Sequence, residues 1–199
     1  MARIEEIRRA LAGRTPTLCE APARAAVALV LRPAAPGSEV LLIERARREG
    51  DPWSGHMAFP GGRQDPEDPD ARVTAERETL EEVGLDLAGA ELVGRLDDLE
   101  GRHAGRPTGL VISAFVYHVS APPPLVCNEE VSEAFWVSLA SLRTPERRVD
   151  YRFRHELGAL ALPGIQVGAS PSHVVWGLTY RFFESFFALL GQPLGERGR

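Results

Sequence analysis

Hydrophobic residues gather in short β-branched and aliphatic runs along most of the chain. The runs at residues 24–33 and 39–45 are separated by the turn sequence AAPGS, a pattern typical of two neighbouring strands. Further strands are expected within residues 91–99, 109–120 and 133–139, and a hairpin is expected from residues 151–157 and 164–167. The chain therefore contains more predicted strands than helices.

Three segments have the patterns of helices. Ile4, Ile7 and Leu11 recur at helical spacing near the start of the chain. A second helix is predicted from about Asp70 to Val83, closed by Gly84. Residues 171–190 begin with proline and are apolar on most sides, which predicts a core helix whose exposed aromatic side chains could form a subunit contact.

The order of these elements predicts an α/β fold. A mixed β-sheet between helices fits a chain in which a long helix follows the early strands and another ends the sequence. A short helical turn is expected at residues 138–143. Because 199 residues suit one core and no repeat or low-complexity linker divides them, we expect a single domain over 1–199.

The predicted helix over 70–83 carries an unusual group of acidic side chains. Glu78, Glu81 and Glu82 fall within an arc of roughly 100° on one face, where like charges repel. Val73, Leu80 and Val83 are expected to form the opposite, core-facing side.

These glutamates have a simple alternative interpretation, a solvated acidic face. A hard divalent cation would instead neutralise them, and Mg²⁺ typically combines few protein carboxylates with substrate phosphate oxygens. Arg77 could pair with a glutamate and fix its rotamer, and the glycines of PGG at 60–62 would let the backbone pass close to the helix. The pattern therefore indicates metal-dependent phosphate chemistry.

Composition and charge narrow the possible partners. Hydrophobic content of 44% and charged content of 26% are typical of a globular protein, and no apolar run has the length of a membrane span. A net charge of -5 argues against general nucleic-acid binding, although local arginines can hold a small phosphorylated ligand. The first residues lack the apolar core of a secretory signal, so we expect a cytoplasmic protein that is a monomer or homodimer.

Residues 61–85 resemble the Nudix box. The family pattern is Gly, five residues, Glu, seven residues, then Arg-Glu-apolar-x-Glu-Glu-x-Gly-apolar. RETLEEVGL at 77–85 matches its second half except at Thr79, where the family has an apolar residue. In the first half, five residues after Gly62 lead to Asp68, and eight residues separate Asp68 from Arg77. The first acidic position is therefore Asp68, with Glu67 as the alternative.

One branch of the family fits further. The longer loop with aspartate, the segment 41–62 (LLIERARREGDPWSGHMAFPGG) and the segments 128–139 and 176–183 resemble coenzyme A pyrophosphatases, over about residues 25–185. The resemblance implies a Nudix-type α/β/α sandwich with a mixed sheet. It also implies hydrolysis of coenzyme A to 3′,5′-ADP and 4′-phosphopantetheine with Mg²⁺ or Mn²⁺. The alternatives are cleavage of ADP-ribose, NADH or another nucleoside diphosphate derivative, and a non-catalytic nucleotide-binding regulator with a Nudix fold.

The resemblance also implies roles for individual residues. The predicted metal ligands are Glu78, Glu81, Glu82 and, more weakly or through water, Asp68. The predicted catalytic residues are Arg77, Glu78, Glu81 and Glu130, and the general base is left open among Glu78, Glu81, Glu129 and Glu130. The predicted contacts to the nucleotide substrate are Arg45, Arg47, Arg48, His56, Phe59, Gly61 and Gly62. For the arginines a solvated turn is the alternative, and for His56 and Phe59 it is structural packing.

Overall fold

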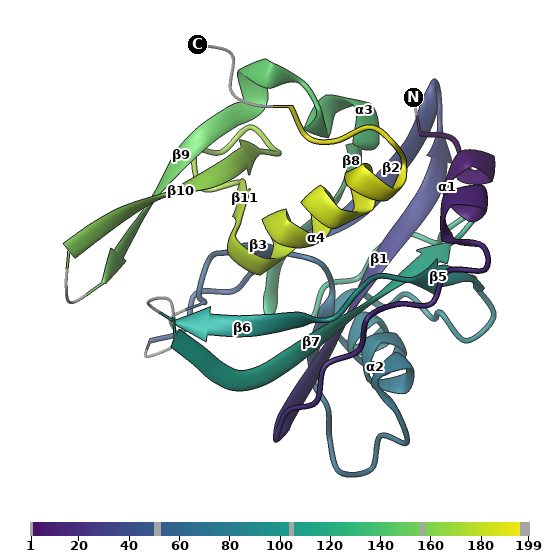
Figure 1. The fold of residues 1–199 in the computed structure, drawn as a ribbon, viewed down its shortest axis with the longest axis horizontal. Coiled ribbons are helices and arrows are strands. Elements are labelled where there is room, and N and C mark those ends of the chain that lie inside the picture. The colour runs from purple at the N-terminus through teal and green to yellow at the C-terminus, as the bar shows by residue number, and fades with distance from the viewer. Residues whose placement is uncertain (1, 50–52, 104–105, 156–157, 196–199) are drawn as a thin grey trace.

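The computed structural model describes residues 2–49, 53–103, 106–155 and 158–195. Within these ranges, most strands belong to one mixed sheet of eight, ordered β3-β2-β1-β7-β5, with β4 on β1, β6 on β7 and β8 on β2 (Figure 1). β1 and β7 are parallel, and the other pairs are antiparallel. The strands of this sheet are β1 (Ala23–Ala34), β2 (Gly37–Arg45), β3 (Met57–Ala58), β4 (Gly61–Arg63), β5 (Glu91–Arg95), β6 (Leu99–His103), β7 (Arg106–His118) and β8 (Val131–Ser138).

A second, three-stranded sheet and the helices complete the described fold. The second sheet has the order β11-β10-β9 and consists of β9 (Arg148–His155), β10 (Gly158–Gln166) and β11 (Val174–Trp176). The helices are α1 (Ile4–Leu11), α2 (Ala71–Val83), α3 (Leu139–Leu142), the 3-10 turn η1 (Pro145–Arg147) and α4 (Gly177–Leu189). The predicted first helix is thereby confirmed, and so is the pairing of the predicted hairpin, of which residues 156–157 lie outside the described residues.

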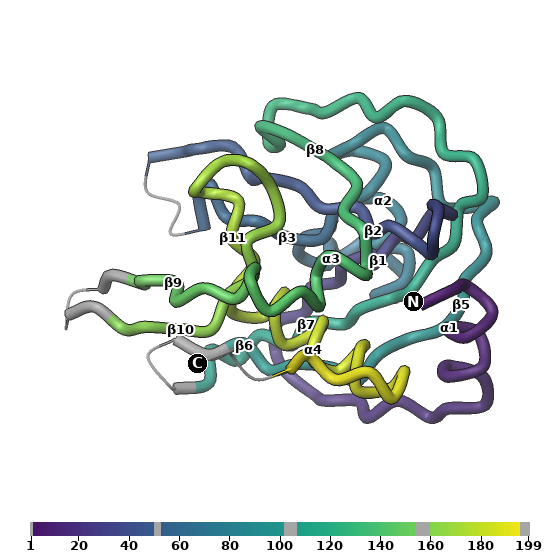
Figure 2. Tube along the Cα trace, turned by 90° about the horizontal axis from the view of Figure 1, so that it is seen from above, coloured from purple at the N-terminus to yellow at the C-terminus, as the bar shows by residue number. Residues whose placement is uncertain are grey.

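The main sheet is covered on both faces. Figure 2 shows α2 and α4 on either side of β1 and β2. Alternate residues of β1 separate the two cores: Leu29 packs on the side of α4, and Val30 packs on the side of α2. The sequence prediction of a mixed sheet between helices is therefore confirmed, and its reason is that both faces of the central strands are apolar.

The ends of α2 agree with the sequence. The Asp70 carboxylate accepts a hydrogen bond from Val73 N at 3.0 Å, which caps the first turn. Gly84 has φ +68° and its N–H donates to Leu80 O, which ends the helix in the left-handed conformation that glycine favours.

The predicted core face of α2 is wrong in part. Leu80 is 49% exposed and Val73 is only partly buried, whereas the buried side chains of the helix are Thr74, Ala75, Thr79, Glu82 and Val83. Small residues face the sheet and allow a close approach, and the Thr79 hydroxyl is satisfied by donating to Ala75 O at 2.6 Å. The helix is therefore rotated so that part of its acidic face is buried.

Two other expectations are corrected. The last helix begins at Gly177, because Val174–Trp176 pairs with β10 as β11. The four phenylalanines of α4 are buried within the chain, so they are not available for the suggested subunit contact (Phe182, Phe183, Phe186 and Phe187). The expected strand within 91–99 ends at Arg95, and a new strand, β6, begins at Leu99.

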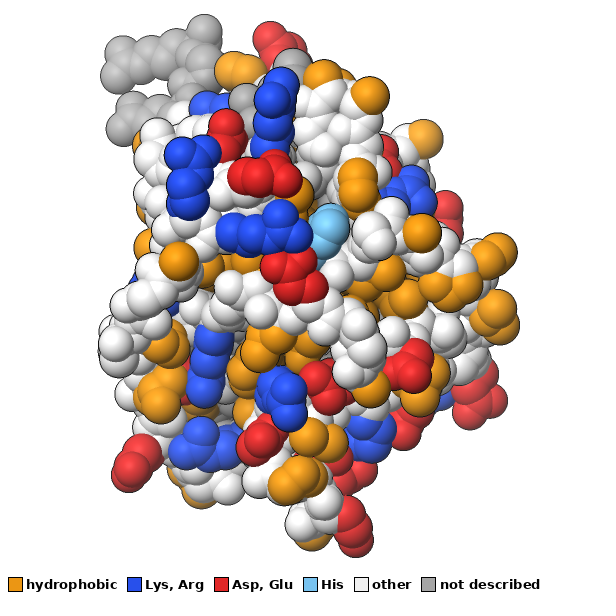
Figure 3. Space-filling model, turned by 90° about the vertical axis from the view of Figure 1, so that its right-hand side faces the viewer, with side chains coloured by type: hydrophobic (Ala, Val, Ile, Leu, Met, Phe, Trp, Pro, Cys, Tyr) orange, Lys and Arg blue, Asp and Glu red, His pale blue; other side chains and the backbone are white. Residues whose placement is uncertain are grey.

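Charged side chains are mixed in sign on the surface. On the face drawn in Figure 3, acidic and basic side chains lie interspersed among hydrophobic ones, without an extended patch of one sign among the described residues. No helix in the described part of the chain combines the length and the apolar character needed to cross a lipid bilayer.

Candidate active site

The glycine pair of β4 lies between β1 and α2. Gly61 and Gly62 pair with Val27 and Ala26 of β1. Gly61 has φ +148°, and a Cβ at this position would overlap the Ala26 carbonyl oxygen, so no other residue fits without strain. The Gly61 N–H donates to Glu82 Oε2 at 2.9 Å. The glycine turn thus binds a carboxylate of the following helix directly.

Glu78 lies over the second glycine. A Cβ on Gly62 would be 2.5 Å from the Glu78 carboxylate, so the missing side chain makes room for this group. Burial raises the pKa of Glu78, and the charges of Glu81 and Glu130 add to the rise, while Arg77, with Nη1 3.0 Å from Oε1, opposes it. Glu78 is therefore held close to the backbone of β4 among other carboxylates.

Glu82 is the most buried carboxylate of α2. Its side chain is 1% exposed, and burial raises its pKa to about 8. The Gly61 N–H and the charge of Arg45 oppose this rise, whereas Glu78 and Glu130 strengthen it. A buried carboxylate beside like charges favours either a proton or a cation.

This donor set fits a hard divalent cation. Carboxylate oxygens are the ligands that Mg²⁺ and Mn²⁺ prefer, and a bound cation would remove the repulsion between Glu78 and Glu82. Glu81 lies one helical turn after Arg77 on the exposed side of α2, where its Oε2 is 3.1 Å from Arg77 Nη1. The structure therefore groups Glu78 and Glu82 and leaves Glu81 more accessible.

Asp68 has a different environment from the other predicted ligands. Both of its oxygens face Arg77, at 3.1 Å from Nε and 2.9 Å from Nη2, and Oδ2 also accepts from Thr74 Oγ1 and Asp65 N. The Arg77 guanidinium lowers the pKa of Asp68 to about 2. These contacts show that both oxygens hold Arg77, and binding of a metal by Asp68, weakly or through water, stays a prediction.

Arg77 joins this loop to the acidic helix. Its guanidinium contacts Asp68, Glu78 and Glu81, and its Nη2 also donates to Arg63 O at 3.2 Å. The prediction that Arg77 fixes a glutamate rotamer agrees with these contacts. Its position beside the glutamates, together with these bonds, indicates a positioning residue.

Residues from two other segments approach the glutamates. Glu130 precedes β8, and Arg48 Nη1 lies 2.9 Å from its Oε1. The charges of Glu130 and Arg45 both act on Glu82, which places these side chains near the site. Glu129 is more exposed and lies 3.8 Å from Arg48. Arg47 packs beside Gly55, and no described contact joins it to the glutamates.

Phe59 does not reach a substrate. Its ring is 2% exposed and packs edge-on against Phe183 of α4, with centroids 4.9 Å apart. The prediction that Phe59 contacts the nucleotide is therefore wrong, and the packing alternative is correct. The reason is that Phe59 points to the opposite face of the sheet from α2.

His56 belongs to an aromatic cluster that the sequence did not indicate. Its ring contacts Trp176 edge-on at 4.8 Å, and Trp176 stacks on Tyr151 at 4.4 Å. The backbone of His56 pairs with Arg45, since Arg45 N donates to His56 O at 3.1 Å. Trp53 lies at the edge of the cluster. Because these residues are up to about 120 positions apart, no local pattern could have revealed them.

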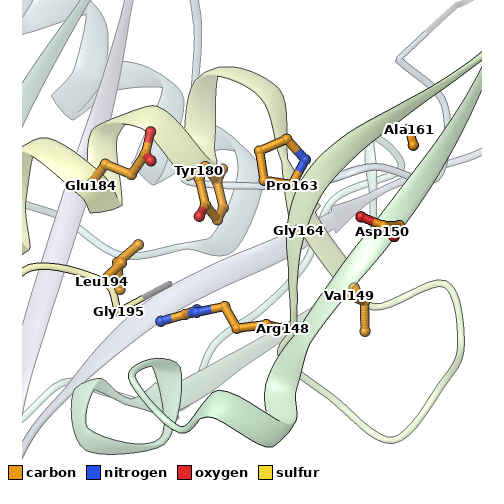
Figure 4. A pocket seen from close by; sticks show the side chains of 10 residues that line it. All are labelled: Arg148, Val149, Asp150, Ala161, Pro163, Gly164, Tyr180, Glu184, Leu194 and Gly195. Carbon is orange, nitrogen blue, oxygen red and sulfur yellow. The ribbon is translucent and has the colours of Figure 1, made fainter. Parts of the chain in front are cut away.

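A pocket of about 360 Å³ lies elsewhere, between β9, β10 and α4 (Figure 4). It is lined by Arg148, Asp150, Tyr180 and Glu184, among others, and contains none of the predicted site residues. Its mixture of acidic and basic groups gives it no clear preference for a ligand charge. We therefore place the candidate active site at the glutamates of α2.

Comparisons with known proteins agree with this geometry. Residues 21–157 match the family model described as the NUDIX domain. The chain is 31% identical to the mitochondrial coenzyme A diphosphatase NUDT8 of Mus musculus, over 94% of this chain and 87% of that protein. It is 33% identical to the Homo sapiens protein of that name, over 92% of this chain and 76% of that protein.

Two further similarities are more limited. An uncharacterized Schizosaccharomyces pombe protein is 46% identical, but over 54% of this chain, and the matched region spans about a third (34%) of that protein. The fold resembles that of a MutT/nudix family protein from Enterococcus faecalis, with a TM-score of 0.54 and 19% identity over 89% of this chain and 65% of that one. The family model and the two relatives matched over most of their length show that this chain belongs to the Nudix family.

Proposed function

We propose that this Nudix protein hydrolyses the pyrophosphate bond of coenzyme A or its derivatives. The observation that carries the proposal is the pair Glu78 and Glu82, held against Gly61 and Gly62 in a chain that matches coenzyme A diphosphatases over most of its length. Water adds across one P–O bond of the diphosphate, and the products are 3′,5′-ADP and 4′-phosphopantetheine.

The chain's own groups would divide the work as follows. Glu78, Glu82 and the more exposed Glu81 would hold Mg²⁺ or Mn²⁺, which would screen the diphosphate charge and lower the pKa of a bound water. Arg77 keeps the acidic helix and its loop in register through Asp68. We propose Glu130 as the group that accepts the proton of the attacking water. Its charge raises the pKa of both Glu78 and Glu82, which indicates that it lies near them, and it comes from a separate loop.

Substrate recognition would use groups on both sides of β2 and β3. Arg45 and Arg48 lie beside Glu82 and Glu130, where their guanidinium groups can contact phosphate oxygens. His56 connects this region to Trp176 and Tyr151, whose flat faces could hold an adenine ring. A nucleotide that carries both a base and an additional phosphate would use the arginines for its phosphates and the aromatic side chains for its base.

The test is a substrate panel with the purified protein. Coenzyme A, acetyl-coenzyme A, ADP-ribose and NADH would each be incubated with Mg²⁺ or Mn²⁺, and the products resolved by liquid chromatography with mass detection. We expect 3′,5′-ADP from free coenzyme A and its acyl derivative at a higher kcat/KM than for the other substrates. Preferred cleavage of ADP-ribose or NADH would replace this proposal with the broader diphosphatase.

The same panel addresses a non-catalytic regulator. Glu82→Gln is the inactive variant, and Glu146→Gln is its control, because Glu146 is exposed in η1 and is not one of the predicted site residues. If neither the wild-type protein nor the control cleaves any of the four substrates while nucleotide still raises the melting temperature, the regulator is favoured.

A further inference from the structure

A second group of metal-ligating side chains lies away from the α2 glutamates. Glu44 of β2 and Glu133 of β8 are directly opposite each other in the antiparallel register, and His173 lies against both. One potential ligand atom from each residue lies within 4.8 Å of the other two. Glu44 precedes Arg45 in an extended strand, so their side chains point to opposite faces of the sheet. This group is therefore separate from the site around Glu82.

The two glutamates need a positive partner. Like charges directly opposite on neighbouring strands destabilise a sheet. The Glu44 side chain is largely buried, and the Ser172 hydroxyl donates to its Oε1 at 3.2 Å, which supplies no charge. Glu133 is 53% exposed, so the group is open to solvent from one side. The arrangement has the charge and the access that a cation needs.

The position of His173 gives the independent second observation. Its ring is more than nine-tenths buried, and Nε2 points between the carboxylates, 3.5 Å from Glu44 Oε2 and 3.4 Å from Glu133 Oε2. Both separations exceed the roughly 2.7–3.2 Å of an N–H···O hydrogen bond. Ligands about 2.1 Å from a tetrahedral Zn²⁺ lie about 3.4 Å from one another. The two separations from Nε2 thus match ligands around a shared ion better than a direct hydrogen bond, and the three ligand atoms all lie within 4.8 Å of one another.

The loop that carries His173 is held in place by its own contacts. Gln166 Nε2 donates to Gly168 O and Ser170 O, and Val167 N donates to His173 O. Gly168 touches the edge of the imidazole, and a Cβ there would overlap Nδ1. The ring is therefore positioned before any ion binds.

We propose that Glu44, Glu133 and His173 form a second metal site that takes a transition-metal ion such as Zn²⁺, with solvent in the remaining position. An imidazole nitrogen favours Zn²⁺ over Mg²⁺, and the two carboxylates balance its charge. The ion joins the edge formed by β2 and β8 to the loop before β11, and so fastens the second sheet to the main one. Nδ1 has no hydrogen-bond partner among the described residues, so we expect the affinity for the ion to be about 10- to 100-fold weaker than in a site where this nitrogen donates to a carboxylate or carbonyl oxygen.

The experiment compares metal binding with and without this group. Isothermal titration with Zn²⁺ and the visible spectrum with Co²⁺ would be recorded for the wild-type protein, His173→Ala, Glu133→Gln and Glu82→Gln. We expect His173→Ala to lose one bound ion and the imidazole-dependent Co²⁺ absorption, and Glu133→Gln to bind at least about 10-fold more weakly. Glu82→Gln is the matched control and keeps this ion, because its side chain lies on the other face.

A stability measurement separates the metal site from a simple ion pair. Zn²⁺ should raise the melting temperature of Glu82→Gln, in which the α2 site is weakened, and this rise should disappear when His173→Ala is added to Glu82→Gln. Glu133→Gln keeps the proposal testable if His173→Ala does not fold, because Glu133 is half-exposed. Equal Zn²⁺ stoichiometry and affinity in the wild-type protein, His173→Ala and Glu133→Gln would overturn the proposal.

Discussion

The two faces of the main sheet assemble their carboxylates in different ways. On the α2 face, Glu78 and Glu82 are four residues apart on one helix and meet the glycines of a turn about 20 residues earlier. On the α4 face, Glu44 and Glu133 come from neighbouring strands and meet His173, which lies 129 positions after Glu44. The first arrangement is formed by one continuous segment of the chain, whereas the second forms only when distant strands pair. A short motif can therefore reveal one face and not the other.

The largest expected effect is on catalysis at the α2 face. Glu82→Gln keeps the size and the acceptor for Gly61 N–H but removes the charge, so kcat/KM on the preferred substrate should fall by about 10²–10³-fold or more. Steady-state kinetics at saturating Mg²⁺ would measure this loss. Activity within twofold of the wild-type protein would show that the glutamates of α2 are not the active site.

The α4 face should respond in stability instead. Phe183 is fully buried between Phe59 and Phe187, so Phe183→Ala should lower the free energy of unfolding by about 3–5 kcal/mol. Urea unfolding followed by fluorescence would measure it. Leu80→Ala is the matched control, because this exposed leucine of α2 should change stability by no more than about 0.5 kcal/mol. A loss above about 2 kcal/mol in the control would restore Leu80 to the core.

The glycine turn tests how closely the α2 face is fitted. A Cβ in Gly62→Ala must displace the Glu78 carboxylate, so we expect kcat/KM to fall by about 10- to 100-fold with little loss of stability. The comparison variant is Gly89→Ala, where a Cβ meets nothing within 4 Å. Equal kinetics for the two variants would contradict the close approach of Glu78 to β4.

Burial of Glu82 should also appear as a stability effect in the absence of metal. Because its folded pKa is raised from 4.5 to about 8, the ionised carboxylate destabilises the fold, and stability is lost as the pH rises from the unfolded pKa to the folded one, with no further loss above it. In a chelator at pH 9, Glu82→Gln should therefore be about 2 kcal/mol more stable than the wild-type protein, or about 4–8 °C in melting temperature. Calorimetry at pH 5 and pH 9 provides the control, since the difference should shrink at the lower pH.

The smallest effect concerns the loop before α2. Asp68 has a folded pKa of about 2, below its unfolded value, so its contribution is complete above about pH 4 and is lost as the pH falls toward 2. Asp68→Asn should be about 1 kcal/mol less stable than the wild-type protein at pH 6, and the two should converge near pH 2. Acid unfolding curves followed by circular dichroism would measure this, and parallel curves would contradict the pairing with Arg77.

Much of the α2 face could be predicted because its determinants are local. Asp70 and Gly84 begin and end the helix through contacts with residues three or four positions away, and such local caps can be recognised in a sequence. The acidic arc follows from helical periodicity alone. The error at Leu80 arose because hydrophobicity suggested the core side, whereas the close approach to β1 and β4 selected small residues and buried Glu82. The contact between Asp68 and Arg77 was not predicted, because the sequence does not show whether a carboxylate will bind a metal or an arginine.

The sequence by itself determined the family and the glutamates that face a glycine turn, because these depend on residues close together in the chain, and it determined the mixed sheet between helices through the order of the elements. Only the tertiary structure decided that Phe59 packs against Phe183 and that His56 meets Trp176 and Tyr151. It also decided that Glu44, Glu133 and His173 lie together, with one potential ligand atom of each within 4.8 Å of the other two. These groups are joined by strand pairing and layer packing over about 40 to 130 positions, and no periodicity in the sequence encodes contacts at that range.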